Sequence, residues 1–144
     1  MKIIALKGPG DSGKSMTLNA VYQFMLLFGY RQEPGHHEEL GNHDFYDCID
    51  ILVKDGVRVG ICMMGDFDSN SEDVEKGYLI QDLLTRLEKS RCDIAICACN
   101  SDKTRGIASI KKRNGIFVNK TVVTKAHDER FVNYQDAEKI YKLI

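Results

Sequence analysis

The run "GPGDSGKS" at residues 8–15 constrains the fold of this chain more than any other feature. It follows the apolar segment "KIIAL", and apolar residues recur after it at the spacing of one helix face, at Leu18, Val21, Tyr22 and Met25. A strand that passes through a glycine-rich turn into a helix is the opening unit of an α/β protein. We therefore predict a strand over about residues 2–7 and a helix over about residues 14–28.

The rest of the chain continues this alternation of strands and helices. Apolar runs at about 48–53 and 57–63 flank Asp55-Gly56, a dipeptide that favours tight hairpin turns between antiparallel strands. The next segments are a helix with Leu83, Leu84 and Leu87 on one face, the buried strand "CDIAICAC", a basic loop "NSDKTRGIASIKKRNG", the strand "IFVNKTVV" and a last helix capped by Asn133. We expect a three-layer αβα fold, with helices on both faces of a mostly parallel five-stranded sheet that has one antiparallel edge strand.

Length and composition exclude several classes of protein. The 144 residues fit a single domain, residues 1–144. A net charge of −1 means that the chain has no excess of positive charge with which to bind nucleic acid or an anionic membrane. No apolar run is long enough to span a bilayer. Without a signal-peptide pattern, and with five cysteines that show no CxxC spacing, we expect a cytoplasmic protein with free thiols and no zinc site.

The glycine loop matches the pattern Gly8-x-x-x-x-Gly13-Lys14-Ser15. Glycines let backbone N–H groups turn inward to form an anion cradle, and the start of a helix adds its positive dipole end. Lys14 would reach the terminal phosphates and the Ser15 hydroxyl would bind Mg²⁺. The expected nucleotide contacts come from Gly8, Pro9, Gly10, Asp11, Ser12, Gly13, Lys14, Ser15 and Met16. The alternative is an ordinary glycine-rich turn capped by Ser12.

With this motif and its context, the chain resembles the P-loop nucleoside triphosphatases, a superfamily of small GTPases, nucleotide and small-molecule kinases, and many ATPases. The resemblance covers the whole chain as an architecture and residues 8–15 as a specific motif. It implies that the protein binds ATP or GTP with Mg²⁺. It further implies that Lys14 contacts the β- and γ-phosphates and that Ser15 ligates the metal.

The family pattern also places an acidic residue after a hydrophobic strand beside the loop. "RVGICMMGDFD" offers Asp66 as the first candidate for Mg²⁺ and Asp68 as the second, although "GDFDSNSE" is also typical of turns and helix caps. Phe67 stands where the additional-strand ATPases of the superfamily carry a catalytic glutamate. The resemblance is therefore to the kinase and GTPase branch, which implies the strand order 2-3-1-4-5, with strand 2 antiparallel at one edge.

Guanine recognition is not carried by the sequence. Asn100-Ser101-Asp102-Lys103 holds residue types of the guanine-binding motif in the wrong order, so we expect ATP rather than GTP. Arg105 follows the same strand and is the candidate cation for charge on a transferring phosphoryl group. Lys111, Lys112 and Arg113 are weaker candidates. These cations equally fit a solvated loop or a face for an acidic partner.

The segment "GHHEELGNHD" concentrates groups capable of metal or proton chemistry: His36, His37, Glu38, Glu39, His43 and Asp44. No two of them have an established ligand spacing, so we expect a polar surface loop within an exposed connection at 30–45.

The sequence thus predicts a protein that binds a nucleoside triphosphate with Mg²⁺ and hydrolyses it or transfers its terminal phosphoryl group. Lys14 and Arg105 are the expected catalytic residues, and Ser15 and Asp66 the expected metal ligands. A non-catalytic nucleotide- or anion-binding module that serves a protein partner is the first alternative. A small-molecule or nucleotide kinase is the second.

Overall fold

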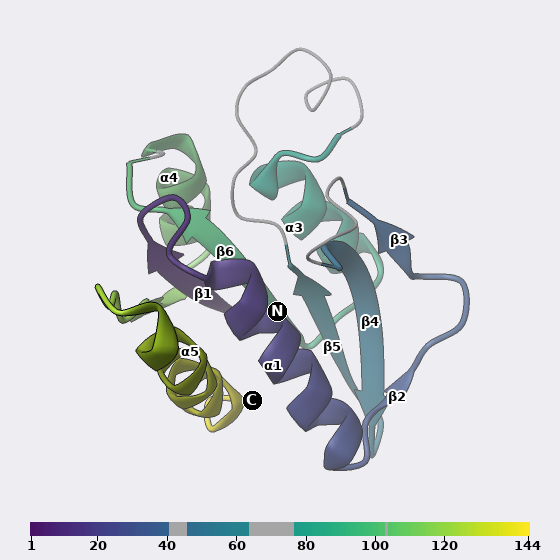
Figure 1. The fold of residues 1–144 in the computed structure, drawn as a ribbon. Coiled ribbons are helices and arrows are strands. Elements are labelled where there is room, and N and C mark those ends of the chain that lie inside the picture. Colours follow the sequence, from purple (N-terminus) through teal and green to yellow (C-terminus); the bar gives the residue numbers. More distant parts are fainter. Residues whose placement is uncertain (41–45, 64–76, 103) are drawn as a thin grey trace.

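The computed structural model describes residues 1–40, 46–63, 77–102 and 104–144. Strands and helices alternate along the chain except over residues 31–62, where the described elements are four strands that follow one another (Figure 1). In chain order they are β1 (Lys2–Gly8), α1 (Lys14–Leu27), β2 (Arg31–Gln32), β3 (Glu38–Glu39), β4 (Cys48–Lys54), β5 (Val57–Cys62), α3 (Ile80–Lys89), β6 (Ile94–Asn100), α4 (Thr104–Lys112), β7 (Ile116–Asn119) and α5 (Ala126–Tyr141). None of the helices within these described ranges is long and apolar enough to cross a membrane.

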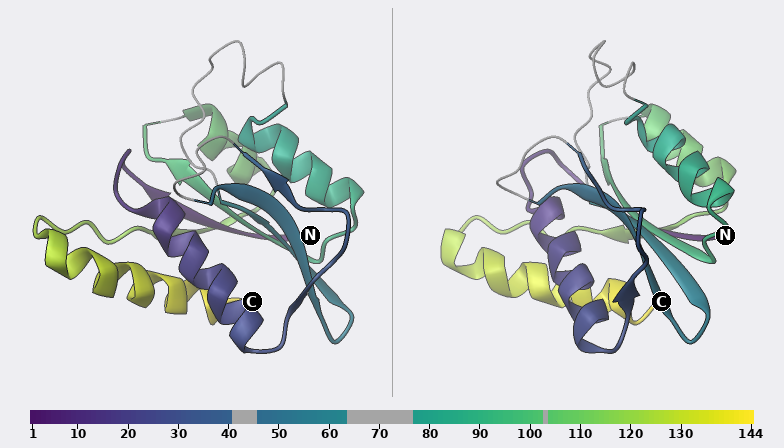
Figure 2. Two further views of the ribbon diagram at one scale, coloured as in Figure 1. Left: turned by 45° about the vertical axis from the view of Figure 1, so that its right-hand side comes forward. Right: turned by 90° about the vertical axis from the view of Figure 1, so that its right-hand side faces the viewer.

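One mixed sheet connects all the described strands, in the order β2-β4-β5-β6-β1-β7, with β3 also paired to β4. The four strands β5, β6, β1 and β7 run parallel, whereas β4 is antiparallel to β5. Helices α1 and α5 cover one face of the sheet and α3 and α4 cover the other, as Figure 2 shows. The α/β class and the mostly parallel sheet are confirmed.

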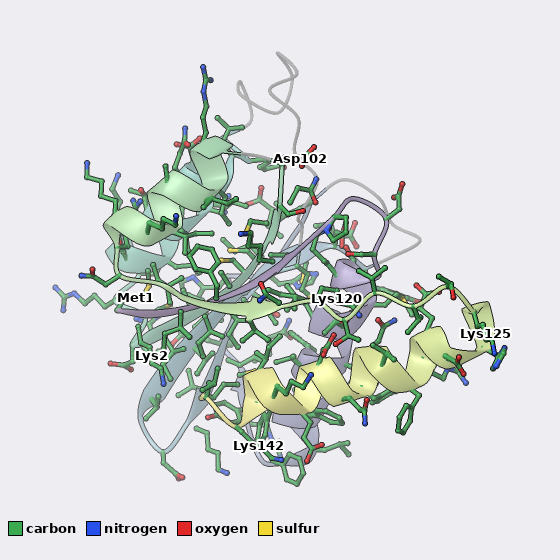
Figure 3. The ribbon with its side chains drawn as sticks, turned by 90° about the vertical axis from the view of Figure 1, so that its left-hand side faces the viewer. Met1, Lys2, Asp102, Lys120, Lys125 and Lys142 are labelled. Carbon is green, nitrogen blue, oxygen red and sulfur yellow. The ribbon has the colours of Figure 1, made fainter. Side chains whose placement is uncertain are left out.

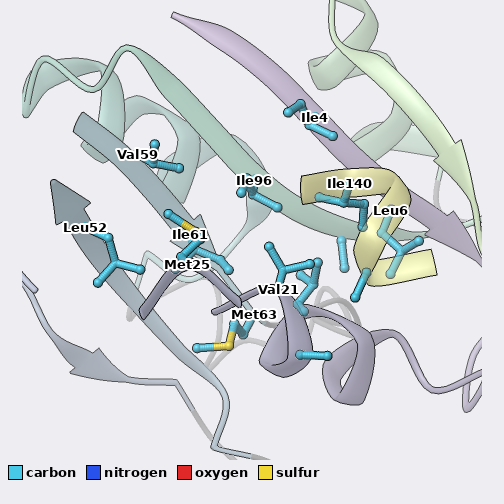
Figure 4. Close-up of a cluster of buried hydrophobic side chains, with 14 of the residues drawn as sticks. Ile4, Leu6, Val21, Met25, Leu52, Val59, Ile61, Met63, Ile96 and Ile140 are labelled. Carbon is cyan, nitrogen blue, oxygen red and sulfur yellow. The ribbon is translucent and has the colours of Figure 1, made fainter. Parts of the chain in front are cut away.

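Side-chain alternation along the strands divides the core into two layers. On the α1 face, Ile4, Leu6 and Ile96 pack against Val21 of α1 and Ile140 of α5 (Figure 4). On the opposite face, alternate strand residues pack against Leu83, Leu84 and Leu87 of α3 and Ile110 of α4. Because successive side chains of a strand point to opposite faces, residue parity in each strand decides which helix pair a residue contacts.

The hairpin between β4 and β5 forms as the sequence predicts. Asp55 has φ 50° and Gly56 has φ 79°, so both central residues are left-handed, as a two-residue hairpin turn of the type I′ class requires. Lys54 pairs with Val57 directly beside this turn. The predicted helix over 14–28 is also confirmed, with Leu18, Val21 and Met25 buried on its inner face.

The predicted strand order and strand count are wrong. β6 lies between β5 and β1, so the glycine-loop strand does not neighbour the strand that leads toward Asp66. The connection β5–α3–β6 joins adjacent parallel strands, which is the common result for consecutive elements of an α/β sheet. In addition, Arg31–Gln32 and Glu38–Glu39 pair with β4, so the expected exposed connection contributes two short strands.

Two further local predictions are wrong. The segment expected as a basic loop forms α4, because Ile107 and Ile110 pack onto the sheet and close the crossover between β6 and β7. The last helix begins at Ala126 rather than at Asn133. Asn133 lies in the middle of α5, where its side chain is buried and does not cap the helix. The five cysteines are buried free thiols, as their spacing predicts.

Candidate phosphate-binding site

The glycine loop leaves the carboxyl end of β1 and turns directly into α1. Gly13 precedes the helix with φ 84°, a left-handed conformation that favours glycine. The first helical hydrogen bond runs from Thr17 N–H to the Gly13 carbonyl at 3.0 Å, and the N-cap residue Gly13 supplies no side-chain hydrogen bond to the helix start. The N–H groups of the first turn therefore have no acceptor within α1, which makes this end attractive to an anion.

The Lys14 side chain lies inside the loop. It is 4% exposed, and its Nζ donates to the Pro9 carbonyl oxygen at 2.5 Å. Ser12 Oγ donates to the same carbonyl oxygen at 2.8 Å. These two hydrogen bonds fold the loop around the ammonium, so a fixed positive charge sits beside the uncapped helix start.

Gly8 allows the end of β7 to approach the loop. A Cβ on Gly8 would lie 2.7 Å from Lys120 Cβ and 3.0 Å from Ser12 Oγ, too close for any larger residue. The Lys120 N–H donates to the Lys7 carbonyl at 2.7 Å, which extends the β1–β7 pairing past β7. Figure 3 shows Lys120 where β7 leads into the connection to α5.

The Lys120 ammonium is neutralised below the loop. Its side chain is 1% exposed and its Nζ lies 3.2 Å from Oδ2 of Asp136, which is fully buried in α5. Asp136 also accepts the Thr121 N–H at 2.7 Å and the Thr121 hydroxyl at 2.9 Å. Burial raises the pKa of Asp136, but hydrogen bonds from Lys139, Thr121 and Lys120 outweigh it and lower the pKa overall.

Asn100 is a site residue that the sequence reasoning missed. It ends β6 in register with Gly8, and Ser101 N–H donates to the Gly8 carbonyl at 2.8 Å. Ile96 and Ala98 of the same strand point to the α1 face, so alternation puts the Asn100 side chain on that face, beneath the start of α1. It is 6% exposed, and its Oδ1 has no hydrogen-bond partner among the described residues. The sequence does show a polar residue, Asn100, at the end of an apolar strand. That Asn100 lies beside Gly8 depends on the strand order, which the sequence does not show.

Ser15 reaches the end of β5 despite the intervening strand. Its Oγ donates to the carbonyl oxygen of Met63, the residue directly after β5, at 3.3 Å. α1 packs across β6, which brings its first turn over the carboxyl end of the neighbouring strand. Two oxygen atoms thus converge where the chain leads toward Asp66, and oxygen atoms are the ligands that Mg²⁺ prefers.

The expected metal carboxylates stay predictions. Asp66, Asp68 and Phe67 lie outside the described residues. Within the described ranges no group of three or more His, Cys, Asp or Glu side chains could hold a metal ion. This finding is compatible with Mg²⁺, which commonly takes only one or two carboxylates and completes its shell with phosphates and water.

The structure does not bring the expected cations together at the loop. Arg105 is exposed in the first turn of α4, which packs on the sheet face opposite α1, so its catalytic role stays a prediction. Lys111 and Lys112 are exposed at the other end of that helix. Arg113 is engaged by Glu88, with Nε 2.9 Å from Oε1. Lys103 lies outside the described residues.

The histidine-rich segment has a structural role as far as it is described. His37 Nδ1 lies 3.3 Å from Oδ2 of Asp50, a buried β4 residue that also accepts the Tyr22 hydroxyl at 2.8 Å and Gln32 Nε2 at 2.7 Å. Burial, together with Asp50, raises the pKa of Tyr22. His36 Nε2 lies 2.8 Å from a Glu33 carboxylate oxygen. These contacts fasten the segment of β2 and β3 to α1 and β4; His43 and Asp44 lie outside the described residues.

The chain was compared with known families, curated proteins and solved structures. No family, curated protein or solved structure matches it. The geometry around Gly8–Ser15 is therefore the basis on which a function is inferred.

Proposed function

We propose that the protein binds the terminal phosphates of a nucleoside triphosphate with Mg²⁺ at residues 8–15 and hydrolyses it. The observation that carries this proposal is the buried Lys14 ammonium, held by the loop beside the uncapped start of α1. A fixed cation beside helix N–H groups that have no acceptor within α1 stabilises a polyanion that loses its hydration water there. A glycine-rich turn of purely structural use has no need of a lysine folded into its centre.

The metal would bind on the Ser15 side of the loop. The Ser15 hydroxyl and the Met63 carbonyl supply hard oxygen donors there, and Asp66 is the expected carboxylate. When bound, Mg²⁺ would neutralise charge on the β- and γ-phosphates. Ser15 would hold the metal, and through it the phosphate chain, while Lys14 would contact the phosphates from within the loop.

Asn100 favours hydrolysis over transfer to a larger acceptor. Its carboxamide oxygen is buried beside Gly8 and has no partner within the described part of the chain, which is costly unless a ligand uses it. A water between this oxygen and the γ-phosphate would donate one hydrogen bond to Asn100 and thereby be oriented for in-line attack. We assign ATP as the preferred nucleotide because residues 100–103 lack the order of a guanine-binding motif.

A second candidate is a nucleotide-binding module without turnover. Lys120, the cation nearest to Gly8 on the β7 side, is already neutralised by Asp136 and so contributes little to a developing charge. A partner protein would then supply the missing cation, as it does for nucleotide switches. A small-molecule or nucleotide kinase is a third candidate.

The test compares the wild-type protein with Lys14→Ala and a matched exposed lysine, Lys112→Ala. We expect the wild type to bind ATP with Mg²⁺ in isothermal titration calorimetry and to release phosphate. Lys14→Ala removes the central cation and should weaken binding at least tenfold, whereas Lys112→Ala should behave as wild type. If neither ATP nor GTP binds the folded wild type, or if both variants lose affinity equally, the proposal is wrong.

A second variant separates hydrolysis from binding. Asn100→Ala should lower kcat at least tenfold with little change in KM, because it removes a contact to the attacking water. Loss of packing at this buried site costs stability, but deletion of a buried oxygen without a described partner offsets part of that cost, so the variant should stay folded. Binding without phosphate release in the wild type would favour the module, and equal kcat in wild type and Asn100→Ala would remove Asn100 from the mechanism.

A further inference from the structure

A groove runs along the molecular surface beside the glycine loop, between α1 and α5. Its volume is about 530 Å³, within the range of roughly 300–1,000 Å³ that is usual for small-molecule sites. Met16, Asn19 and Gln23 line it from α1, and Glu129, Asn133 and Tyr134 line it from α5. The two helices lie side by side on one face of the sheet in Figures 1 and 2.

The groove begins next to the glycine loop. Met16, which directly follows Ser15 and is the third residue of α1, lines the groove. α5 also touches the loop: a Cβ on Gly13 would lie 2.8 Å from Asn133 Oδ1 and 3.1 Å from Glu129 Oε1. Thr17 Oγ1 donates to Asn133 Oδ1 at 3.3 Å, which fixes this side of α5 against the first turns of α1. A ligand anchored in the loop would therefore pass Met16 into the groove.

The dimensions suit a nucleoside. From Met16 to Gln23 the helix rises by about 10 Å, at roughly 1.5 Å per residue. A ribose and a base, placed end to end after the phosphates, span a similar length. Glu129 stands at the loop end of this path, where a carboxylate would accept hydrogen bonds from ribose hydroxyls.

The lining chemistry suits a base, and adenine in particular. Tyr134 is 43% exposed and Met16 is 51% exposed, so an aromatic ring and a polarizable thioether are both accessible for stacking. Gln23 is exposed and carries a carboxamide, which presents a donor and an acceptor side by side. This pair matches the amino group and ring nitrogen on one edge of adenine.

We infer that the groove between α1 and α5 is the nucleoside subsite of the phosphate loop, and that it takes adenosine. This inference rests on the proposed triphosphate binding at Gly8–Ser15, because the phosphates anchor the nucleoside at Met16. It adds base selectivity, which residues 8–15 alone do not provide. The subsite is built by the packing of α5 on α1, far along the chain from the glycine loop.

The test separates the groove from the loop by means of inorganic tripolyphosphate, which carries the phosphates without a nucleoside. ATP, GTP and tripolyphosphate, each with Mg²⁺, are titrated into wild type, Tyr134→Ala and Phe131→Ala. Phe131 is the matched control, because it is a 66% exposed aromatic residue of α5 that does not line the groove. Loss of stacking in Tyr134→Ala should weaken ATP binding about tenfold and leave tripolyphosphate affinity unchanged. Phe131→Ala should match wild type for all three ligands.

Each contrary result identifies what failed. If wild type binds neither tripolyphosphate nor a nucleotide, the proposed function and the subsite both fall. If wild type binds tripolyphosphate but Tyr134→Ala binds ATP as tightly as wild type, only the subsite is wrong. Equal weakening of ATP and tripolyphosphate would reduce Tyr134 to a structural role and overturn the assignment. Tighter binding of GTP than of ATP would overturn the choice of adenine.

Discussion

Replacement of Asp136 by asparagine tests the buried ion pair that supports the glycine loop. The change keeps the shape of the side chain and an oxygen that can accept the Thr121 N–H, but it removes the charge. The Lys120 ammonium, 1% exposed, would keep the Thr121 carbonyl at 2.7 Å as an acceptor but would face no negative charge among its described hydrogen-bond partners. Removal of one partner of a buried pair costs about 3–5 kcal/mol, because the other charge is left uncompensated.

That cost is a large fraction of the total stability. A domain is stable by about 5–15 kcal/mol, so Asp136→Asn should remove roughly a fifth or more of the free energy of unfolding. At about 3–4 °C per kcal/mol for a chain of this size, the melting temperature should fall by about 10–20 °C. Chemical denaturation followed by circular dichroism measures the free energy directly.

A double-mutant cycle isolates the pair. In Lys120→Met with Asp136→Asn no buried charge is left, so the double variant should be more stable than Asp136→Asn alone, with a coupling energy of about 1–3 kcal/mol. Lys139→Met is the control, because Lys139 is 58% exposed and its 2.9 Å contact to Asp136 should contribute no more than about 1 kcal/mol. If Asp136→Asn costs less than about 1 kcal/mol, or if the two single effects simply add, the pair does not act as described.

The same pair sets a pH dependence. Because the pKa of Asp136 is lowered in the folded state, its stabilising effect is complete above the unfolded pKa of about 3.9 and is lost as the pH falls through the lower folded pKa. Below pH 4, the free energy of unfolding of the wild type should therefore fall more steeply than that of Asp136→Asn. Parallel curves would show that Asp136 titrates in the same way in both states.

The remaining predictions concern the loop backbone and the thiols. Gly13→Ala should lower the free energy of unfolding in urea by about 1–2 kcal/mol, because φ 84° disfavours a Cβ and Asn133 Oδ1 would lie 2.8 Å from it. Gly10→Ala is the control and should change this free energy by less than about 0.5 kcal/mol, because no atom lies within 4 Å of a Cβ there. Equal effects of the two substitutions would contradict the geometry. Burial raises the pKa of Cys99 to about 11 and that of Cys48 to about 12, so mass spectrometry should find the native thiols unmodified by iodoacetamide at pH 8 and the denatured ones alkylated. Alkylation of native protein at the denatured rate would contradict this burial.

Much of the local structure could be predicted because it depends on short-range patterns. The spacing of Leu18, Val21 and Met25 predicted the inner face of α1, and Asp55-Gly56 predicted the hairpin turn. Predictions at segment ends were weaker: Asn133 was expected to cap a helix that begins at Ala126. A polar residue within a helix resembles a cap in sequence, and only its burial against Thr17 and Gly13 distinguishes the two.

Some residues of the candidate site could likewise be predicted from the sequence, and others could not. Lys14, Ser15 and the glycines form a contiguous motif, so the sequence located them without knowledge of the fold. Asn100 could not be found in this manner, since its position beside Gly8 exists only because β6 lies next to β1. The expected order placed β5 there instead, on the basis of the hairpin and of Phe67, which lies outside the described residues.

The sequence by itself determined that a strand, a glycine loop and a helix open this chain, and that its central strands are buried on both faces. Hydrophobic periodicity and glycine placement act over a few residues, so they are readable from the chain alone. Only the tertiary structure decided which strands are neighbours, because the ladder hydrogen bonds join backbone groups that are alike in every residue. That choice set Asn100 beside Gly8, carried Ser15 across β6 to Met63, and packed α5 against the loop with Lys120 and Asp136 buried beneath it.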